Sequence, residues 1–306
     1  MTKNTIDEHK IYYLGPKGTF GEEAAIKYAK SNNTNNKSRL VNLTLIEKPS
    51  HEAIAREIAK NGSVGVIGYY NYLEGLVQEC VDLIYENNLH IIDTKRITIT
   101  LAMGRHTTNS NNSIVYSHPK ALAQCSNFLY KNYPDINLIE TPSTTDAINK
   151  VLKEKKGLVI AKKESLKKCH KKGIEIIAND IGNNKNNKQN YTDFYVVSKT
   201  NKSISSDANT TMFAVVPHID RVGLLQGILS QISFYGINIH KIHSRPAIDG
   251  VNIYENEEPQ MFYLEVGVNP KQEEFKRLID SLNFGLKPKG SNVEVVRVLG
   301  AYYIQK

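Results

Sequence analysis

The chain has 306 residues, a formal net charge of +8 and 40% hydrophobic residues, which is typical of a soluble protein with about two or three globular domains. No apolar run approaches the roughly 18 residues that a membrane span needs, and the polar N-terminal stretch MTKNTIDEHK predicts no signal peptide. Three widely separated cysteines without metal-ligand spacing favour the reducing cytoplasm.

The positive charge does not indicate nucleic-acid binding. The lysines are dispersed, and no basic stripe is interleaved with aromatic residues as a nucleic-acid groove requires. The densest run, KKESLKKCHKK at residues 162–172, is typical of a helix with a solvated face. A small polyanionic substrate is equally compatible with the excess of positive charge.

Strand and helix patterns alternate through the first 200 residues. Strands are expected at 10–15, 63–70 and 113–118, helices at 21–30, 75–88 and 119–133, and a strand followed by a helix at 157–169. This order predicts parallel sheets covered by helices. Three Asn-rich segments, 31–38, 107–113 and 182–190, are expected to be surface loops. The strand KQNYTDFYVVSK follows at 188–199 and contains Asp193, a residue type that strands avoid.

The C-terminal region has a different order. Strands are expected at 209–219, 237–247, 259–268 and 292–303, with helices at 220–236 and 271–285. The resulting order, βαββαβ, predicts a ferredoxin-like module. Residues 197–211 are polar and poor in large apolar side chains, so we expect them to form the linker.

Four strand-to-helix junctions carry polar residues or glycine, in the place where open α/β sheets bind ligands. They are LGPKGTF at 14–20, NYLEG at 71–75, SHP at 117–119 and PSTTDAI at 142–148. Free N–H groups at the helix starts favour an anion. Each junction alone also has a structural explanation, since Ser143 or Thr144 can cap a helix and His118 can be a structural histidine. Convergence of all four with the TDF strand predicts one binding cleft.

In chain order, YLGPKGTFGEEAA, NYLEG, SHPKALAQC, STTDA, NYTDF and HSRP resemble the motifs of prephenate dehydratases with a C-terminal ACT regulatory domain. The resemblance extends from about residue 11 to residue 303. It implies an α/β fold with a two-lobed catalytic domain at 10–204, similar to periplasmic binding proteins, and prephenate bound between the lobes. Lobe 1 is then about 10–100 with 190–204, lobe 2 about 101–185, and the ferredoxin-like ACT domain 209–303.

The resemblance also implies site residues. The catalytic residues are Thr192, Asp193, Phe194, Tyr72 and Glu74, and the substrate-binding residues are Lys17, Gly18, Thr19, Asn71, Ser117, His118, Ser143 and Thr144. The positions where relatives bind phenylalanine are Val222, Gly223, Leu224, Leu225, His243, Ser244, Arg245 and Pro246, with Leu224 in place of Ala and His243 in place of Glu. Side-by-side pairing of ACT domains predicts a homodimer or homotetramer. Neither a metal-ligand cluster nor a nucleotide fingerprint is found, so no metal or cofactor is expected.

Four positions depart from the family motifs. Asp193 replaces the Arg of Thr-Arg-Phe, Tyr70 and Tyr72 replace the Glu and Ser of ENSxEG, and Gly21 replaces a Ser. Dehydration of prephenate requires the ring hydroxyl to leave with help from a proton donor or a group that stabilises negative charge. Changing Arg to Asp reverses the local field.

The departures therefore favour the reaction of divergent family members, in which prephenate loses carbon dioxide, keeps its hydroxyl and becomes dihydro-4-hydroxyphenylpyruvate. Asp193 or Tyr72 would then hold the hydroxyl. Two alternatives stay open: a dehydratase that forms phenylpyruvate for phenylalanine biosynthesis, and an inactive ligand-sensing homologue. Strand alternation adds a further alternative, because in a regular strand Thr192 and Phe194 face the substrate while Asp193 points away and pairs with a surface lysine.

Overall fold

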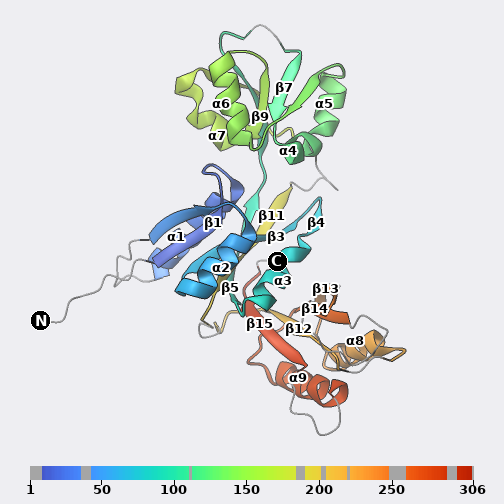
Figure 1. The fold of residues 1–306 in the computed structure, drawn as a ribbon. Helices are drawn as coiled ribbons and strands as arrows, with labels where there is room; N and C mark the ends of the chain where they lie inside the picture. The colour runs from blue at the N-terminus through green and yellow to red at the C-terminus, as the bar shows by residue number, and fades with distance from the viewer. Residues whose placement is uncertain are drawn as a thin grey trace, which may run out of the picture. The chain divides into compact units, whose positions relative to one another are not determined.

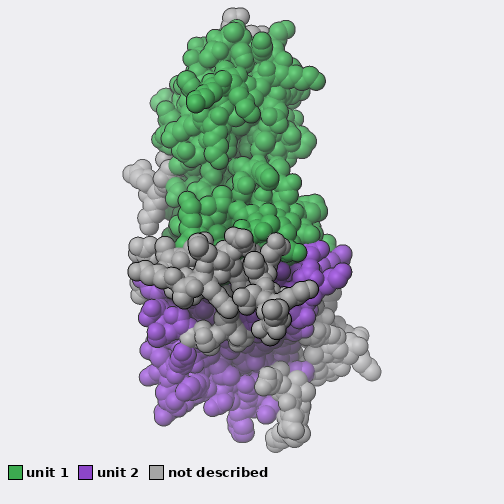
Figure 2. Space-filling model, turned by 90° about the vertical axis from the view of Figure 1, so that its left-hand side faces the viewer, with its two compact units in different colours: residues 1–54, 66–77, 95–194 green, residues 55–65, 78–94, 195–306 purple. Residues whose placement is uncertain are grey.

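The computed structural model describes residues 9–35, 43–109, 112–183, 190–200, 205–218, 221–247, 260–287 and 295–304. The chain forms two compact units (Figure 2). Unit 1 contains Met1–Ile54, Val66–Val77 and Lys95–Phe194, and unit 2 contains Ala55–Gly65, Gln78–Thr94 and Tyr195–Lys306. Because unit 2 includes two segments from the first hundred residues, the predicted domain boundaries stay a prediction.

The first sheet includes the consecutive strands β5-β11-β3-β1-β2, and in the described residues the strands of the C-terminal module continue it beyond β5. Its elements are β1 (His9–Leu14), α1 (Phe20–Asn35), β2 (Leu43–Lys48), α2 (His51–Asn61), β3 (Val64–Asn71), β4 (Gly75–Leu76), α3 (Gln78–Glu86), β5 (His90–Thr98) and β11 (Tyr191–Ser198). Strands β1 and β2 pair in parallel. Strand β3, VGVIGYYN, is buried along most of its length, as expected for a strand covered on both faces.

The second sheet has the strand order β10-β6-β9-β7-β8. Its elements are β6 (Leu101–His106), β7 (Ile114–Ser117), α4 (Pro119–Gln124), α5 (Ser126–Asn132), β8 (Asn137–Glu140), α6 (Thr144–Glu154), β9 (Leu158–Lys162), α7 (Lys163–Lys168), the 3-10 helix η1 (His170–Lys172) and β10 (Ile174–Ala178). Strand β7 is parallel to β8 and β9, so the carboxyl ends of β7 and β9 share one edge. Strand β6 is antiparallel to both of its neighbours.

Helices cover both faces of the second sheet, with α4 and α5 on one side and α6 and α7 on the other (Figure 1). Alternate residues of β9 explain this arrangement. Leu158 and Ile160 belong to the core cluster that includes Leu122 and Leu129 of α4 and α5. Val159 and Ala161 belong to the cluster on the opposite side, with residues of α6 and α7.

Four sequence-based expectations in these sheets need correction. The helix expected at 75–88 extends only over Gln78–Glu86, and Gly75–Leu76 forms β4. The single helix expected at 119–133 is broken at Cys125, whose backbone (φ −112°, ψ 10°) is not helical. Residues 31–35 of the first Asn-rich segment continue α1 instead of forming a loop. In the basic run 162–172, Lys162 ends β9 and is not part of the solvated helix. The rest of the Asn-rich segments lies partly outside the described residues, at 36–38, 110–111 and 184–189.

The C-terminal elements confirm the predicted βαββαβ order. They are β12 (Thr210–Val215), α8 (Leu224–Phe234), β13 (Ile239–Pro246), β14 (Gln260–Val266), α9 (Glu273–Leu286) and β15 (Val296–Tyr302). The strands are antiparallel in the order β13-β14-β12-β15. Phe213, Leu264 and residues of both helices form their shared core. The expected linker at 197–211 is shorter, because β11 extends to Ser198 and β12 begins at Thr210; residues 201–204 lie outside the described residues.

No helix within the described ranges is both long enough and apolar enough to cross a membrane.

Candidate active site

Asn71 and Thr192 form a hydrogen-bonded pair where β3 and β11 lie side by side. The Asn71 side chain is 6% exposed, and its Oδ1 accepts the backbone N–H groups of Leu73 (3.0 Å) and Glu74 (3.1 Å). Because backbone N–H groups can only donate, these bonds fix the amide orientation, and Nδ2 donates to Thr192 Oγ1 at 3.1 Å. The Thr192 oxygen therefore acts as an acceptor in this pair, and its proton is not used in the bond to Asn71. Phe194, on the same side of β11, is buried.

Asp193 points to the opposite side of β11, where it pairs with Arg96 of β5. The guanidinium donates from Nε to Oδ1 at 2.7 Å and from Nη2 to Oδ2 at 2.9 Å. The Asp193 side chain is 10% exposed and that of Arg96 is 47% exposed. Hydrogen bonding to Asp193 raises the pKa of Arg96, although burial opposes the shift. The pair explains why a strand contains a carboxylate here. It agrees with the alternative in which strand alternation points Asp193 away from the substrate, with an arginine as partner in place of the expected lysine.

The departures at 70 and 72 lie on the Asp193 side. The Tyr72 ring stacks on the Tyr191 ring with 5.1 Å between centroids, and the Tyr72 N–H donates to the Tyr191 carbonyl at 3.0 Å. The Tyr70 ring lies 6.3 Å from the Tyr191 ring, and the Arg96 Cζ lies 3.8 Å from the centre of the same ring. We call these five residues, Tyr70, Tyr72, Arg96, Tyr191 and Asp193, the Tyr191 cluster. Burial is the main cause that raises the pKa of Tyr191.

Gly21, the fourth departure, lies in the first turn of α1. A Cβ atom at this position would lie 3.0 Å from the carbonyl oxygen of Leu14. The close approach of α1 to the end of β1 therefore favours glycine over serine here.

Glu74 connects the two sheets of unit 1. Its Oε1 accepts a hydrogen bond from Gln124 Nε2 at 2.9 Å, and its Oε2 lies 3.4 Å from Lys120 Nζ. Both partners belong to α4, whose N-cap is His118, with Nδ1 accepting from the Lys120 N–H. Sequence reasoning selected Glu74 and His118 and missed Lys120 and Gln124. Their i, i+4 spacing, which puts them on one helix face, was the available signal.

Three predicted substrate-binding residues, Ser117, Ser143 and Thr144, have roles within the fold. The fully buried Ser117 donates from Oγ to the Ile160 carbonyl at 2.6 Å and thereby joins β7 to β9. Ser143 is the N-cap of α6: its Oγ accepts from the Asp146 N–H at 3.0 Å and donates to the Asp146 carboxylate at 2.7 Å. Thr144 is the first residue of that helix. The helix-cap explanation therefore accounts for Ser143, and its contact with substrate stays a prediction.

Two backbone N–H groups of the 17–19 loop donate to carboxylates of the same protein. The Gly18 N–H donates to Glu22 Oε2 at 2.6 Å and the Lys17 N–H to Glu47 Oε2 at 3.1 Å. Thr19 Oγ1 accepts from the Glu22 N–H at 3.4 Å, as an N-cap of α1. Gly18 has φ +89°, a conformation that favours glycine. The N–H groups predicted to receive a substrate carboxylate are thus occupied by side chains of the same protein.

The same loop contacts the second sheet and its helices. Thr145 Oγ1 donates to the Lys17 carbonyl at 3.3 Å and Ser165 Oγ to the Gly18 carbonyl at 3.4 Å. Lys162 and Glu23 form an ion pair nearby. Together with the Glu74 contacts, these bonds bring segments of the four predicted motifs to the junction of the two sheets of unit 1.

The predicted regulatory residues occupy two elements of unit 2. Gly223 is the N-cap of α8 with φ +82°, and Leu224 is buried in the C-terminal core while Val222 is exposed. His243–Pro246 is the end of β13, where Arg245 pairs with Asp82 of α3 at 2.7 Å. Burial, and then the charge of Arg245, lowers the pKa of His243.

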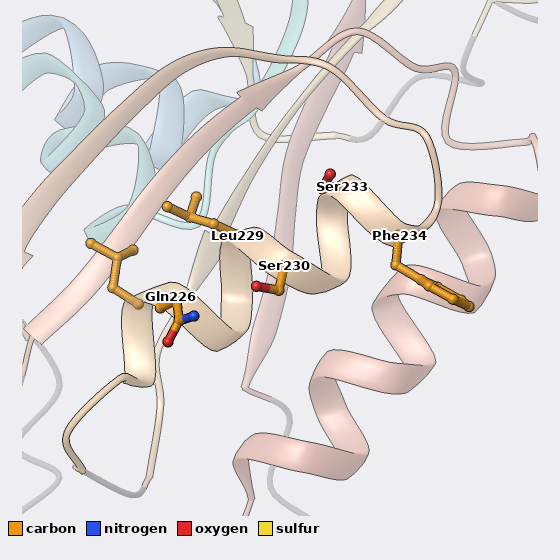
Figure 3. A pocket seen from close by; sticks show the side chains of 6 residues that line it. Gln226, Leu229, Ser230, Ser233 and Phe234 are labelled. Carbon is orange, nitrogen blue, oxygen red and sulfur yellow. The ribbon is translucent and has the colours of Figure 1, made fainter.

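The exposed face of α8 carries an open hollow of about 710 Å³. It is lined by Leu225, Gln226, Leu229, Ser230, Ser233 and Phe234 (Figure 3). Leu225 is the one predicted regulatory residue that lines it. Phe234 is 84% exposed, which is unusual for a large apolar side chain.

Within the described part of the chain, no group of three or more His, Cys, Asp or Glu residues is arranged to hold a metal.

Residues 11–202 match the family model described as prephenate dehydratase. The bifunctional chorismate mutase/prephenate dehydratase of Aquifex aeolicus (strain VF5) is 27% identical over 299 residues, which is 96% of this chain and 73% of that protein. The prephenate dehydratase of Bacillus subtilis (strain 168) is 28% identical over 257 residues, 80% of this chain and 86% of that protein.

Two solved structures share the fold. The prephenate dehydratase from Staphylococcus aureus subsp. aureus Mu50 has a TM-score of 0.76 at 23% identity, covering 96% of this chain and 100% of that one. The prephenate dehydratase from Arthrobacter aurescens, solved in complex with L-Phe, has a TM-score of 0.76 at 21% identity, covering 96% of this chain and 89% of that one.

Proposed function

The chain belongs to the prephenate dehydratase family, and we propose that it converts prephenate to phenylpyruvate. In this reaction the bond from the ring to its carboxylate breaks, and the electron pair enters the ring as carbon dioxide leaves. The ring hydroxyl departs with the electron pair of its C–O bond and, once protonated, becomes water. A hydrogen-bond donor at the leaving oxygen lowers the barrier, because negative charge develops there.

The pairing of Asn71 with Thr192 supports this function most directly. Asn71 donates to Thr192 Oγ1 at 3.1 Å, and the amide cannot turn over without losing two backbone hydrogen bonds. The Thr192 proton is thereby not used in the bond to Asn71, which supports its donation to the substrate. We assign Thr192 the role of donor to the leaving hydroxyl and Asn71 the role of positioning residue.

Decarboxylation without aromatisation has less support. That interpretation placed Asp193 or Tyr72 beside the substrate hydroxyl. In the structure Asp193 pairs with Arg96 and the Tyr72 ring stacks on Tyr191, both on the side of β11 away from Thr192. Relatives are named as dehydratases, alone or fused to a chorismate mutase. Both considerations support dehydration over the reaction that retains the hydroxyl.

We further propose an effector site and an assembly for the C-terminal module. The Arthrobacter aurescens structure contains L-Phe, and this chain has the βαββαβ order of elements with Val222–Leu225 at the start of α8 and His243–Pro246 on β13. An aromatic amino acid is the proposed ligand of these two segments. The exposed apolar hollow on α8 is the proposed surface for a homodimer or homotetramer.

Incubation of the full chain with prephenate tests the proposed function. Product mass and ultraviolet spectrum distinguish phenylpyruvate from the dihydro-hydroxyphenylpyruvate diene, after the acid-promoted background has been subtracted. Phenylpyruvate is expected from the wild type, and from Thr192→Ala at a rate about a hundredfold lower or less. The diene as main product would support decarboxylation, and neither product would indicate a ligand-sensing homologue.

A further inference from the structure

Lys162 was not selected by sequence reasoning, yet it lies at the edge of the second sheet that carries the SHP motif. It is the last residue of β9. Strand β9 is parallel to β7, which ends at Ser117, and the Ser117 hydroxyl donates to the carbonyl of Ile160, two residues before Lys162. Ligands of α/β proteins bind at the carboxyl ends of such parallel strands.

The Lys162 side chain reaches from this edge to the first turn of α1. Its ammonium pairs with Glu23 and lies 5.1 Å from the centre of the Phe20 ring. The loop that precedes this turn contains Lys17, Gly18 and Thr19, the residues predicted to receive substrate. The ammonium therefore contacts the helix turn that follows one group of predicted substrate-binding residues, and its strand pairs with the strand that ends at the other.

The two members of the ion pair are not equally accessible. The Lys162 side chain is 12% exposed, whereas that of Glu23 is 42% exposed. Burial lowers the pKa of Lys162, and the charge of Lys168 adds to this effect. An exposed carboxylate can turn out into water at little cost, but a buried ammonium needs an anionic partner. The arrangement thus favours replacement of Glu23 by another carboxylate while Lys162 stays in place.

A cation is needed here because the backbone donors of the adjacent loop are already used. The Lys17 and Gly18 N–H groups donate to Glu47 and Glu22. Prephenate carries a ring carboxylate, which leaves as carbon dioxide, and a pyruvyl carboxylate, which stays in the product. A buried cation on the ring carboxylate would stabilise the charge that the reaction must remove, so it would oppose catalysis. A cation on the pyruvyl carboxylate anchors the substrate without this cost.

We propose that Lys162 binds the pyruvyl carboxylate of the substrate and that Glu23 occupies the ammonium until substrate displaces it. This inference rests on the proposed function. In this proposal Glu23 competes with the substrate, so its removal should improve substrate binding. In a purely structural ion pair, removal of either residue should impair substrate binding.

The test compares Lys162→Met, Lys162→Arg and Glu23→Gln with the neighbouring control Lys163→Met, whose wild-type ammonium pairs with Asp180 at the surface. Loss of a hydrogen bond between charged groups predicts a KM for prephenate raised about ten- to hundredfold in Lys162→Met, with a much smaller change in kcat. Glu23→Gln is expected to lower KM about two- to fivefold, because it removes an exposed charge that competes with the substrate for the Lys162 ammonium. Lys162→Arg retains most of the affinity, and Lys163→Met is unchanged.

Calorimetry with phenylpyruvate, which keeps the pyruvyl carboxylate, gives a second measurement that does not need turnover. Its Kd should rise in Lys162→Met and fall in Glu23→Gln. Shifts in the same direction for both variants would identify a structural ion pair and overturn the inference. A Kd in Lys162→Met equal to that of the wild type would also overturn it. So would the absence of phenylpyruvate binding in both the wild type and Glu23→Gln. If opposite shifts occur while the wild type leaves prephenate unchanged, the carboxylate site stands and the proposed function fails.

Discussion

The ion pair between Arg96 and Asp193 predicts a loss of stability without a change of product. Arg96→Met removes the guanidinium and leaves the Asp193 carboxylate, 10% exposed, without this partner. Breaking a buried pair costs about 3–5 kcal/mol and breaking an exposed pair about 0–1 kcal/mol. Since Arg96 is 47% exposed, we expect an intermediate cost of about 2 kcal/mol. Asp193→Asn leaves a half-exposed guanidinium that water solvates, so its cost should be about 1 kcal/mol.

Hydrogen exchange in β11 measures this cost locally. A cost of about 2 kcal/mol corresponds to roughly thirtyfold faster exchange of the β11 amides in Arg96→Met. Arg105→Met is the control in the second sheet: Arg105 pairs with Glu175 at 2.6 Å, but this carboxylate is 37% exposed, so the variant should leave the exchange of the β11 amides unchanged. Phenylpyruvate should remain the product of Asp193→Asn. Unaltered exchange in Arg96→Met would refute the pairing, and a diene product from Asp193→Asn would show that Asp193 acts on the substrate.

Three further predictions concern turnover, pH and the effector. Thr192→Ala should lower kcat by about a hundredfold or more and change the free energy of unfolding by no more than about 1 kcal/mol, whereas Thr192→Ser should retain most activity; equal kcat in Thr192→Ala would remove it as the donor. Burial lowers the pKa of His90 and His243 from 6.5, so the unfolded chain binds protons at a pH where the folded chain does not. The thermal midpoint should therefore fall as pH drops below about 6.5, and His243→Gln should reduce this dependence; an identical pH profile would contradict it. Calorimetry should detect phenylalanine binding that Arg245→Met weakens, and equal affinity in the variant would place the effector elsewhere.

Local patterns were sufficient for the order of most elements but not for their pairing. The βαββαβ order of the C-terminal module and the strand-helix alternation before it both follow from periodicity. Strand β8, with the sequence NLIE and mostly exposed side chains, lacks such a signal. It is a strand because it pairs in parallel with β7, which is a tertiary effect. The antiparallel pairing of β6 with β9 and β10 is likewise a long-range property.

For the candidate site, too, local patterns predicted the segments but not the contacts between them. Glycine and polar residues at strand ends marked loops that meet where the sheets of unit 1 adjoin, and their role in binding substrate stays a prediction. The partner of Asp193 could not be found from the motif, since Arg96 is 97 residues away in the chain. Lys162 was hidden in a basic run that resembles a solvated helix face. The end of β9 at this residue distinguishes its side chain, which is 12% exposed, from the exposed Lys167 and Lys168 that follow.

The sequence already indicated on which strand face Asp193 lies, because the departures from the family motifs fall at alternate positions. The departures at Tyr70 and Tyr72 flank Asn71, and Thr192 lies between Tyr191 and the departure at Asp193. Because successive side chains of a strand point to opposite faces, changes at alternate positions accumulate on one face and leave the other intact. The Tyr191 cluster packs on that altered face, while Asn71 and Thr192 pair on the other. A charge reversal in a family motif is therefore evidence of changed chemistry only when the altered side chain shares a face with the reacting groups. In this chain the altered charge is matched by Arg96, and the Thr192 hydroxyl, our proposed donor, lies on the other face.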